Sequence, residues 1–520
     1  MRWGRSWEAE RAAADGQSRK QWAAAWLLLL AGFATVALQP LTNIDIAWHL
    51  LAAREWRRGA ELYVEIRDPN LPAAWLLYRA QWWLGELAGL PAHRVFFCLV
   101  AAWGCLCGWL TQRLLPAASA TDRWLRLATL AGIGGFFALA SLHQAGQRDY
   151  IIVLGLLPYA AWVHRLAGGP ATDGRWLGAL ATLLALLALQ LKPYAILALL
   201  TLELWLVWRR RSLWTWWRVD LLLPGLLLAL LVVAQLRAQP AYRQVLADWG
   251  GYYARQGRTG LSDRILATLA LYGAALLWSV LTRRRDGWGQ TLLALAGGAL
   301  LVCAAQDKWW DYHAYPFELL VELAWCVLLA EALCLRAVRR QGGAPRWRGA
   351  VRLALGLAVL AWFAWIALLA ARQQKLLTWD RPPQAEIQAL TAALDGEAAG
   401  QPVAFFGGLN ALIAVYHSQA RWGLTGHTLW VEGPLVGVRR TGEPLPEWLA
   451  AAAQRHFADV LDRLRRGRPA LLGFFHGAPG APNDFLALYR DQPAIALLLE
   501  RDYEPWGDIA GYALYRRRSP

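Results

Sequence analysis

The feature that most constrains this chain is a succession of apolar stretches, most of them long enough to cross a lipid bilayer as a helix. A spanning helix needs about 20 predominantly apolar residues, because the hydrocarbon core is about 30 Å thick. About eleven stretches before residue 375 meet this requirement or come close to it. They are Trp22–Gln39, Arg94–Leu114, Trp124–Leu142, Tyr150–Leu166, Trp176–Leu191, Tyr194–Trp208, Leu221–Leu236, Ile265–Leu281, Thr291–Ala305, Pro316–Leu335 and Leu353–Ala371. The pattern predicts an all-α polytopic membrane domain.

The composition also favours a membrane-embedded chain. Hydrophobic residues make up 57% of the sequence and charged residues 17%, which leaves too much apolar surface for a water-soluble fold. The net charge of +16 comes largely from arginines between the apolar stretches, a placement typical of loops beside anionic lipid. We therefore attribute the basicity to membrane topology and expect membrane lipid, not nucleic acid, as a partner. All six cysteines lie in apolar stretches, so no disulfide framework is expected.

The arginines also indicate the orientation of the helices. Pro72–Gly89 carries polar residues among its tryptophans, a pattern that suits a helix lying along the membrane interface. If that segment does not span, every loop on the cytoplasmic side is basic, as the positive-inside rule requires. If it did span, the clusters around Arg209, Arg283 and Arg339 would lie outside. We expect a protein of the bacterial inner membrane with a cytoplasmic N-terminus and an extracytoplasmic C-terminus.

These considerations divide the chain into a cytoplasmic N-terminus (1–21), a transmembrane domain (22–375) that includes a long first extracytoplasmic loop (41–91), and an extracytoplasmic tail (376–520). In the tail the hydrophobic periodicity changes. Val403–Phe406 and Ala470–Phe475 have the composition of short buried strands. Helices are expected at Gln384–Leu394, Glu447–Leu464 and Asn483–Tyr489. The tail is therefore predicted to be an α/β domain.

On this topology, the polar residues of the membrane domain collect at the extracytoplasmic ends of the helices. The clusters are residues 43–49, 67–70, 143–150, 190–194 and 306–316. Ionisable groups near the hydrocarbon are costly unless they are paired or line a polar cavity. Several such groups on one side of the membrane therefore indicate a functional site.

The cationic members of these clusters suit a phosphate group. Guanidinium and ammonium groups are the usual phosphate-binding groups of proteins. The candidates for this role are Arg148, Lys192, Lys308 and His313. Cations in these positions would also stabilise the charge that develops on a phosphate leaving group.

The carboxylates of the same clusters are the candidates for catalysis, with Asp45 and Asp149 foremost. Asp45 would act as general base, since a carboxylate within hydrogen-bond reach can remove the proton of an attacking hydroxyl. A second carboxylate, Asp149 or Asp68, would orient the acceptor or hold a divalent cation through oxygen ligands. His49 and Tyr312 lie in the same clusters and, with Asp68, are the expected substrate-binding residues.

Each of these residues also has a simpler explanation when it is taken alone. Lys192 and Arg148 lie at helix ends, where long basic side chains reach the headgroups. Asp45 can cap a helix. The histidines of these clusters match no zinc-binding spacing and are more often ordinary hydrogen-bonding groups. The argument for a site is therefore the coincidence of several clusters on one side of the membrane.

Several short segments of the chain are similar to those of a known superfamily. They are Asn43–His49 with its Asp45, the Asp-Pro-x-x-Pro segment Asp68–Pro72, Gly146–Asp149, Leu191–Tyr194, Lys308–His313 and, near the end of the chain, Gly511–Arg516. Together they resemble the GT-C integral-membrane glycosyltransferases, which include protein O-mannosyltransferases and lipid A aminoarabinose transferases. The chain is similar to bacterial members of this superfamily over most of its length.

The resemblance implies transfer of a sugar from a polyprenyl-phosphate carrier to a lipid, glycan or protein acceptor at the outer face, with inversion and with Asp45 as the base. It implies no certain cofactor beyond a divalent cation in some branches. The chain departs from the family pattern at two points. No Asp-Glu pair occurs at Asp45, and Trp309 stands where the pattern Lys-Gly-Trp has glycine. Trp309–Asp311 also has the letters of the oligosaccharyltransferase Trp-Trp-Asp signature, but it precedes a membrane stretch and we treat the match as coincidence.

Two other functions are compatible with the pattern. A transporter or flippase for lipid-linked saccharides would use basic groups to guide a phosphate, but such proteins usually carry charge within the helices. Here the main charged residues within apolar stretches are Glu203, Glu318 and Glu322. The other alternative is a non-catalytic membrane subunit of a glycan assembly system, whose tail binds a partner.

Overall fold

The computed structural model describes residues 3–41, 43–117, 119–140, 144–169, 174–250, 261–281, 287–339, 384–427, 429–477 and 482–519. The chain divides into two compact units. The first, called the helical unit here, consists of Met1–Gln39, Arg94–Val232 and Arg258–Ala370. The second, called the tail unit, consists of Pro40–His93, Val233–Gly257 and Ala371–Pro520.

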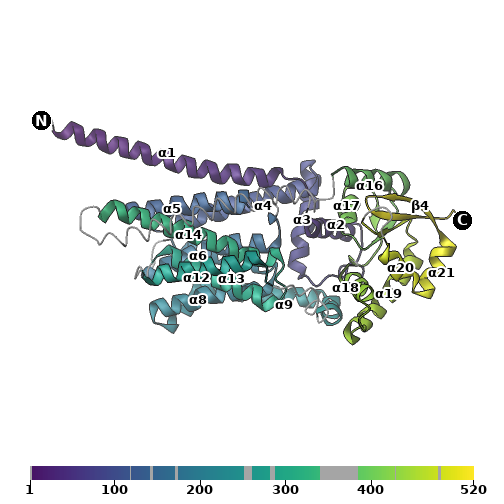
Figure 1. Ribbon diagram of the computed structural model, residues 1–520. Helices are drawn as coiled ribbons and strands as arrows, with labels where there is room; N and C mark the ends of the chain where they lie inside the picture. Colours follow the sequence, from purple (N-terminus) through teal and green to yellow (C-terminus); the bar gives the residue numbers. More distant parts are fainter. Residues whose placement is uncertain are drawn as a thin grey trace. The chain divides into compact units, whose positions relative to one another are not determined.

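The helical unit is a bundle of long helices (Figure 1). Its elements are α1 (Trp3–Leu38), α4 (Ala92–Leu114), α5 (Ala120–Gly132), η1 (Ile133–Ala140), α6 (Arg148–Gly168), α7 (Arg175–Leu189), η3 (Pro193–Ala195), α8 (Ile196–Arg210), η4 (Leu213–Trp216), α9 (Val219–Ala238), α12 (Asp263–Leu281), α13 (Trp288–Gln306) and α14 (Asp311–Arg339), with α9 continuing into the tail unit. Helix α13 packs against α8, α12 and α14, and α6 packs against α7. Several of the helices, including α5, α6, α13 and α14, run side by side in Figure 1.

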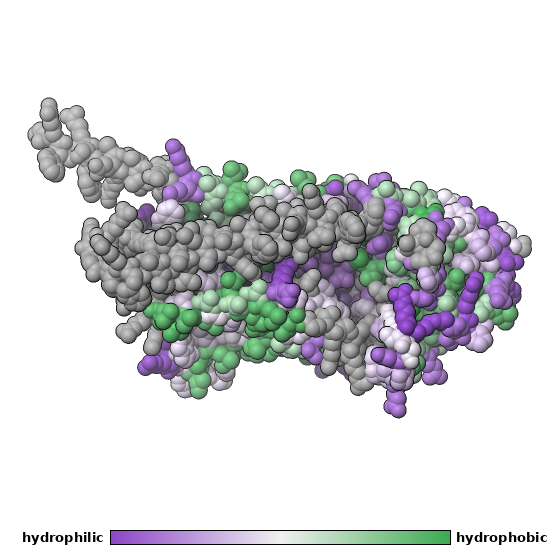
Figure 2. Space-filling model, in the orientation of Figure 1, coloured by the Kyte–Doolittle hydropathy of each residue, from purple (hydrophilic) through white to green (hydrophobic). Residues whose placement is uncertain are grey.

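Within the described residues, seven helices are long and apolar enough to cross a membrane, judged by length and composition. They are Lys20–Leu38, Ala92–Leu114, Arg148–Gly168, Val219–Ala238, Asp263–Leu281, Trp288–Gln306 and Tyr312–Ala332. Hydrophobic side chains lie on the outside of this bundle, whereas hydrophilic ones are frequent over the C-terminal tail (Figure 2). The predicted helical membrane protein with a C-terminal α/β domain is confirmed at this level.

The remaining predicted spans are shorter helices or lie outside the described residues. Trp124–Leu142 is divided between α5 and the π-helix η1, and the other two stretches form the 15-residue helices α7 and α8. Leu353–Ala371 lies outside the described residues. The π-helical segment packs closely on α1, since a Cβ at Gly134 would lie 2.9 Å from the backbone of Leu29. Small residues at such a contact let two helix backbones approach in a membrane.

The tail unit contains the first loop as well as the tail. The loop forms α2 (Ile44–Arg57) and α3 (Pro72–Ala88), and α3 is not among the seven candidate spans. Arg54 in α2 is buried and donates hydrogen bonds to the carbonyls of Tyr416, Ser418 and Ala420, at 3.2, 2.9 and 2.6 Å. The tail unit therefore includes the first loop as well as the domain that the sequence predicted to begin at residue 376. The buried guanidinium of Arg54 hydrogen-bonds the loop to the tail.

The tail is an α/β domain built around a five-stranded sheet with the order β2-β1-β3-β5-β4. Strand β1 pairs in parallel with β2 and β3, while β5 is antiparallel to β3 and β4. The strands are β1 (Pro402–Phe406), β2 (Arg421–Trp422), β3 (Leu471–Phe475), β4 (Tyr503–Ile509) and β5 (Tyr512–Arg517). The helices are α16 (Gln384–Glu397), α17 (Asn410–His417), α18 (Leu429–Thr441), α19 (Glu447–Gly467), α20 (Asp484–Arg490) and α21 (Pro493–Asp502). The tail unit also holds α10 (Pro240–Val245) and η5 (Leu246–Gly250).

Successive side chains of the central strands point to opposite faces of the sheet, as in any β-strand. One face of β1 and β3 buries Ala404, Phe406, Leu472 and Phe474 against side chains of α19, α20 and α21. On the other face, the ring of Phe405 packs on Tyr512 of β5. The two strands and three helices predicted for the tail are confirmed, whereas β2, β4, α17, α18 and α21 were not predicted.

The turn between β4 and β5 offers a test of the tail's folding. Ala510 and Gly511 form a two-residue loop with φ of 56° and 76°, the conformation of a type I′ turn. Ala510→Asn should stabilise the tail by about 1 kcal/mol, because asparagine tolerates the left-handed region better than alanine. The check is the free energy of exchange of the β4 and β5 amides, measured by hydrogen exchange on the purified protein.

Gly511→Ala is the matched control for that change. Its added Cβ would lie 2.5 Å from the carbonyl oxygen of Gly477, so the same amides should exchange faster. Equal exchange in the two variants would contradict the turn geometry.

Candidate functional site

Six of the residues predicted for the site lie in the helical unit, and we call them the cationic cluster. They are Arg148, Asp149, Lys192, Lys308, Tyr312 and His313. They come from three places that are far apart in the sequence: the start of α6, the turn before η3, and the connection from α13 into α14. Each place is the end of an apolar helix, so the packing of the helices brings the polar residues together.

Lys192 and Asp149 form the ion pair at the base of this cluster. The Lys192 ammonium donates to the Asp149 carboxylate, and the two residues are only 4% and 5% exposed. The ammonium also lies 4.9 Å from the centre of the Tyr312 ring, within the range of a cation–π contact. Asp149 therefore holds Lys192 in place, and the catalytic role predicted for it stays a prediction.

Lys308 lies in the connection between α13 and α14 and is 2% exposed. Its ammonium sits 4.6 Å from the centre of the Trp310 ring. Burial, together with the charge of Lys192, lowers the pKa of Lys308 to about 7. The side chain therefore changes its charge near neutral pH, which an exposed lysine does not do.

The backbone on both sides of Lys308 is in the left-handed region. Asp307 has a φ of 49° and ends α13 by donating its N–H to the carbonyl of Ala304, while Trp309 has a φ of 51°. Glycine adopts this conformation at little cost, whereas other residues pay about 1–2 kcal/mol. The backbone at Trp309 therefore has a conformation that glycine favours.

His313 is the most deeply buried member of the cluster, at 1% exposure. Trp310 stacks on its ring at 5.3 Å, and Tyr312 meets it edge-on at 4.2 Å. Among the described residues, neither ring nitrogen has a hydrogen-bond partner. An imidazole always carries at least one N–H donor, and a buried polar atom left unsatisfied costs about 1–3 kcal/mol.

Three cations are close enough for their charges to act on the His313 ring. They are Lys192, Lys308 and Arg148. Asp149 pairs with Lys192, and the charges of all three cations act on the imidazole in the same direction. Such surroundings favour an anion.

The other predicted residues, Asp45, His49 and Asp68, lie in the tail unit. Asp45 is half-buried in the first turn of α2, where a carboxylate is favoured by the helix dipole. The N-cap of that helix is Asn43, whose side chain accepts a hydrogen bond from the N–H of Ile46. The capping role that the sequence offered as a simpler explanation of Asp45 therefore belongs to Asn43.

Asp68 is 2% exposed, and its oxygens are held by several donors. One oxygen accepts from the indole N–H of Trp48 at 3.0 Å, and the other accepts from both the backbone and the side-chain N–H of Asn70. The Asn70 amide also donates to Nε2 of His49 at 3.1 Å. The Nδ1–H of His49 in turn donates to the backbone carbonyl of Asp45. Asp68 and His49 thus hold the loop in shape around Asp45.

His427 joins this group from the tail, although nothing in the sequence singled it out. Its ring meets Trp48 edge-on at 5.5 Å. Burial lowers the pKa of His427, while the charges of Asp68 and Asp45 oppose that shift. A local spacing rule had no way to find this residue, because it is more than 350 positions from Asp68 in the sequence.

A small cavity of about 30 Å³ lies beside this group, between the loop and the tail. Its polar lining includes Asp68, Thr425, His427 and Asp459. Small-molecule sites usually have volumes of about 300–1,000 Å³, so this cavity does not hold a sugar. Within the described ranges, no group of three His, Cys, Asp or Glu side chains is placed to hold a metal ion. The two carboxylates considered for a divalent cation have partners within the protein. Asp68 accepts hydrogen bonds from Trp48 and Asn70, and Asp149 forms an ion pair with Lys192.

The comparisons with known proteins leave the family open. No protein-family model matches this chain, and no curated protein matches it either. The resemblance to the GT-C superfamily therefore rests on the short segments alone. Three of these segments supply the cationic cluster, and two supply Asp45 and Asp68.

Proposed function

We propose that this protein is a membrane glycosyltransferase of the GT-C type, which moves a sugar from a polyprenyl-phosphate donor to an acceptor at the extracytoplasmic face. The observation that carries the proposal is the buried His313, whose ring nitrogens lack partners among the described residues while three cations act on it. A phosphate oxygen would accept the imidazole N–H, and its charge would balance the cations. Arg148, Lys192, Lys308 and His313 are thus assigned to the donor phosphate.

In the proposed reaction, the acceptor hydroxyl attacks the anomeric carbon of the sugar and a new carbon–oxygen bond forms. The bond from that carbon to the phosphate oxygen breaks, and the phosphate leaves with the electron pair. The proton of the hydroxyl goes to Asp45. Cations fixed around the leaving phosphate stabilise its developing charge without having to reorganise.

The two other carboxylates have supporting roles in this proposal. The three hydrogen bonds on Asp68 occupy its oxygens, so we assign it to shaping the loop and not to proton transfer. Asp149 positions Lys192 through their ion pair. Tyr312 lies beside Lys192 and His313, while His49 is hydrogen-bonded to the backbone of Asp45; both are assigned to substrate binding. No step in this reaction requires a divalent cation.

A transporter fits the charge distribution less well. Glu203 accepts a hydrogen bond from Arg218 at 3.0 Å, and Glu318 forms an ion pair with Arg264. Two of the three carboxylates that a transporter would use within the helices are thus paired with arginines. The cationic cluster lies at the helix ends, as expected for an enzyme with its site on one side of the membrane.

The proposal includes the topology. Eleven spans, an interfacial α3, a cytoplasmic N-terminus and an extracytoplasmic tail in the bacterial inner membrane keep every cytoplasmic loop basic. The same topology puts the cationic cluster and the loop that carries Asp45 on the extracytoplasmic side. If a cysteine introduced at residue 410 were labelled only by a reagent added on the cytoplasmic side, this topology would be refuted.

Asp45→Asn tests the base. The amide has the size of the carboxylate but cannot accept the proton, so sugar transfer should fall by a factor of about 100 or more. Donor binding and membrane insertion should be unchanged. Transfer is measured by mass spectrometry of the purified protein's products with polyprenyl-phosphate sugars.

Glu61→Gln, an exposed carboxyl of the same loop, is the control for that change and should retain wild-type transfer. Transfer that survives Asp45→Asn would refute the base. Donor turnover lost equally in both variants would point to damage to the loop.

The pH dependence of donor binding tests Lys308. Because its pKa is lowered to about 7, Lys308 is charged below that pH and neutral above it in the unliganded protein. A phosphodiester keeps its charge throughout, so donor affinity should fall by up to about tenfold per pH unit above neutrality. Binding of a non-transferable donor analogue, measured from about pH 6 to about pH 9, checks this.

Lys308→Arg keeps the charge and should move the loss of affinity to higher pH, whereas Lys308→Met should bind weakly at every pH. An identical profile in wild type and Lys308→Arg would show that another group titrates.

The ion pair of Lys192 and Asp149 can be tested with a double-mutant cycle. Asp149→Asn leaves a buried ammonium without its counterion and should cost about 3–5 kcal/mol of stability. Adding Lys192→Met should recover most of that stability, yet donor binding should remain lost. Thermal unfolding and donor-analogue binding are measured on all variants, and additive effects on stability would contradict the pairing.

A further inference from the structure

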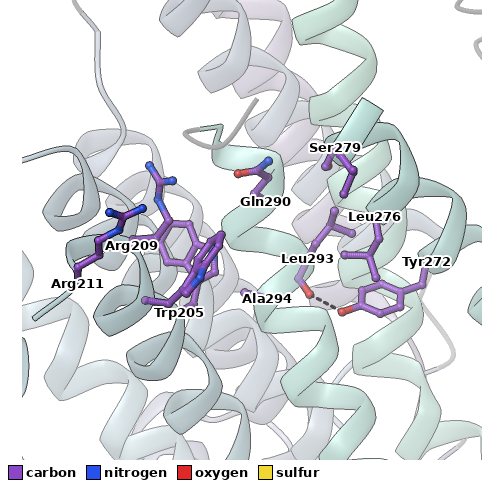
Figure 3. A pocket seen from close by; sticks show the side chains of 11 residues that line it. Trp205, Arg209, Arg211, Tyr272, Leu276, Ser279, Gln290, Leu293 and Ala294 are labelled. Carbon is purple, nitrogen blue, oxygen red and sulfur yellow. Dashed lines mark hydrogen bonds between the residues drawn. The ribbon is translucent and has the colours of Figure 1, made fainter. Parts of the chain in front are cut away.

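The helical unit has a hollow that the proposed reaction does not use (Figure 3). Its volume is about 1050 Å³, and it lies between three helices: α13 packs against both α8 and α12, and all three contribute to its walls. Tyr272 and Leu276 come from α12, while Leu293 and Ala294 come from α13. The hydroxyl of Tyr272 donates to the carbonyl of Leu293 at 3.1 Å and fixes the inner end of the hollow.

One end of this hollow is polar and basic. Arg209 and Arg211 come from the C-terminal end of α8, and Gln290 comes from the first turn of α13 (Figure 3). The Arg209 guanidinium lies 5.9 Å from the ring centres of both Trp205 and Trp208. Contacts of this length are within the cation–π range, so the tryptophans orient a positive group at the mouth of an apolar slot.

The hollow and the cationic cluster lie toward opposite ends of the same helices. Lys192 precedes the start of α8, whereas Arg209 is near its end. Lys308 follows the end of α13, whereas Gln290 lies near its start. A helix of 19 residues such as α13 is about 28 Å long, so the two sites are separated by nearly the thickness of the hydrocarbon core.

We propose that this hollow binds an anionic phospholipid, with the headgroup phosphate at Arg209 and Arg211 and an acyl chain along the apolar wall. Guanidinium groups bind phosphate oxygens through paired hydrogen bonds. Apart from Ser279, the rest of the wall is mostly apolar, and it continues onto the outside of α12, where Leu276 and Val280 are 42% and 72% exposed. An occupant with one anionic end and a long apolar chain matches both parts of the lining, whereas a soluble anion would leave the apolar wall uncovered.

The basic end also fits the proposed orientation of the chain. Arg209, Arg210 and Arg211 belong to a loop on the cytoplasmic side, where anionic lipids are enriched in the adjoining leaflet. Basic pockets between membrane helices on that side are suited to lipid headgroups. The site is therefore a cytoplasmic-leaflet lipid site, distinct from the donor site.

The experiment is native mass spectrometry of the purified full chain in detergent, titrated with dioleoyl phosphatidylglycerol or dioleoyl phosphatidylcholine. The wild type should retain one phosphatidylglycerol with an affinity at least about tenfold above that for phosphatidylcholine, because only the former carries net negative charge. Arg209→Gln combined with Arg211→Gln should remove most of this preference. Equal retention of the two lipids by the wild type would refute the proposal.

Two further variants separate a built pocket from a generally basic surface. Arg210→Gln removes the same charge from the same helix end, but Arg210 does not line the hollow, so binding should stay near wild type. Ala294→Trp fills the hollow without changing the charge and should weaken binding by about tenfold or more. Loss of binding in Arg210→Gln equal to that of the double variant, or wild-type binding in Ala294→Trp, would overturn the proposal.

Discussion

The buried ion pair of Lys192 and Asp149 joins the end of one apolar helix to the start of another. Placing charge in such surroundings is expensive, and a pair offsets the cost only when its geometry and remaining hydrogen bonds are good. Around this pair lie Lys308 and Arg148, whose charges act on His313. The helical unit thus concentrates several positive charges around one buried ring. The lowered pKa of Lys308 follows from its burial and from the neighbouring charge of Lys192.

Much of the fold could be predicted because its signals are local. Apolar length predicted the long apolar helices, and short apolar runs with aromatic residues predicted β1 and β3. What the sequence did not reveal depends on distant partners. The strand β2 is only Arg421–Trp422, too short to show any periodicity. Arg54 links the first loop to the tail through hydrogen bonds to three carbonyls. In the sequence it is indistinguishable from an ordinary surface arginine.

The candidate site was predictable to a similar extent. Arg148, Lys192 and Lys308 could be grouped because each follows or precedes an apolar helix, and helix ends on one side of a membrane are neighbours by necessity. The roles within the group were harder. The sequence alone does not distinguish an aspartate that accepts a proton, as proposed for Asp45, from one that accepts structural hydrogen bonds. Asp68 is of the second kind, with three hydrogen bonds. Only the contacts distinguish the two, and His427 entered only through its contact with Trp48.

The three hydrogen bonds of Arg54 have a consequence for biosynthesis. The carbonyls that satisfy this guanidinium come 362 to 366 residues later in the chain. At a synthesis rate of about 5–20 residues per second, the first loop waits for about 20–70 seconds before its partners exist. During that interval a cationic side chain and the apolar face of α2 have no tail to cover them. The loop therefore depends on the membrane surface or on chaperones for its solubility, and truncations that remove the tail should be degraded even though every spanning helix is intact.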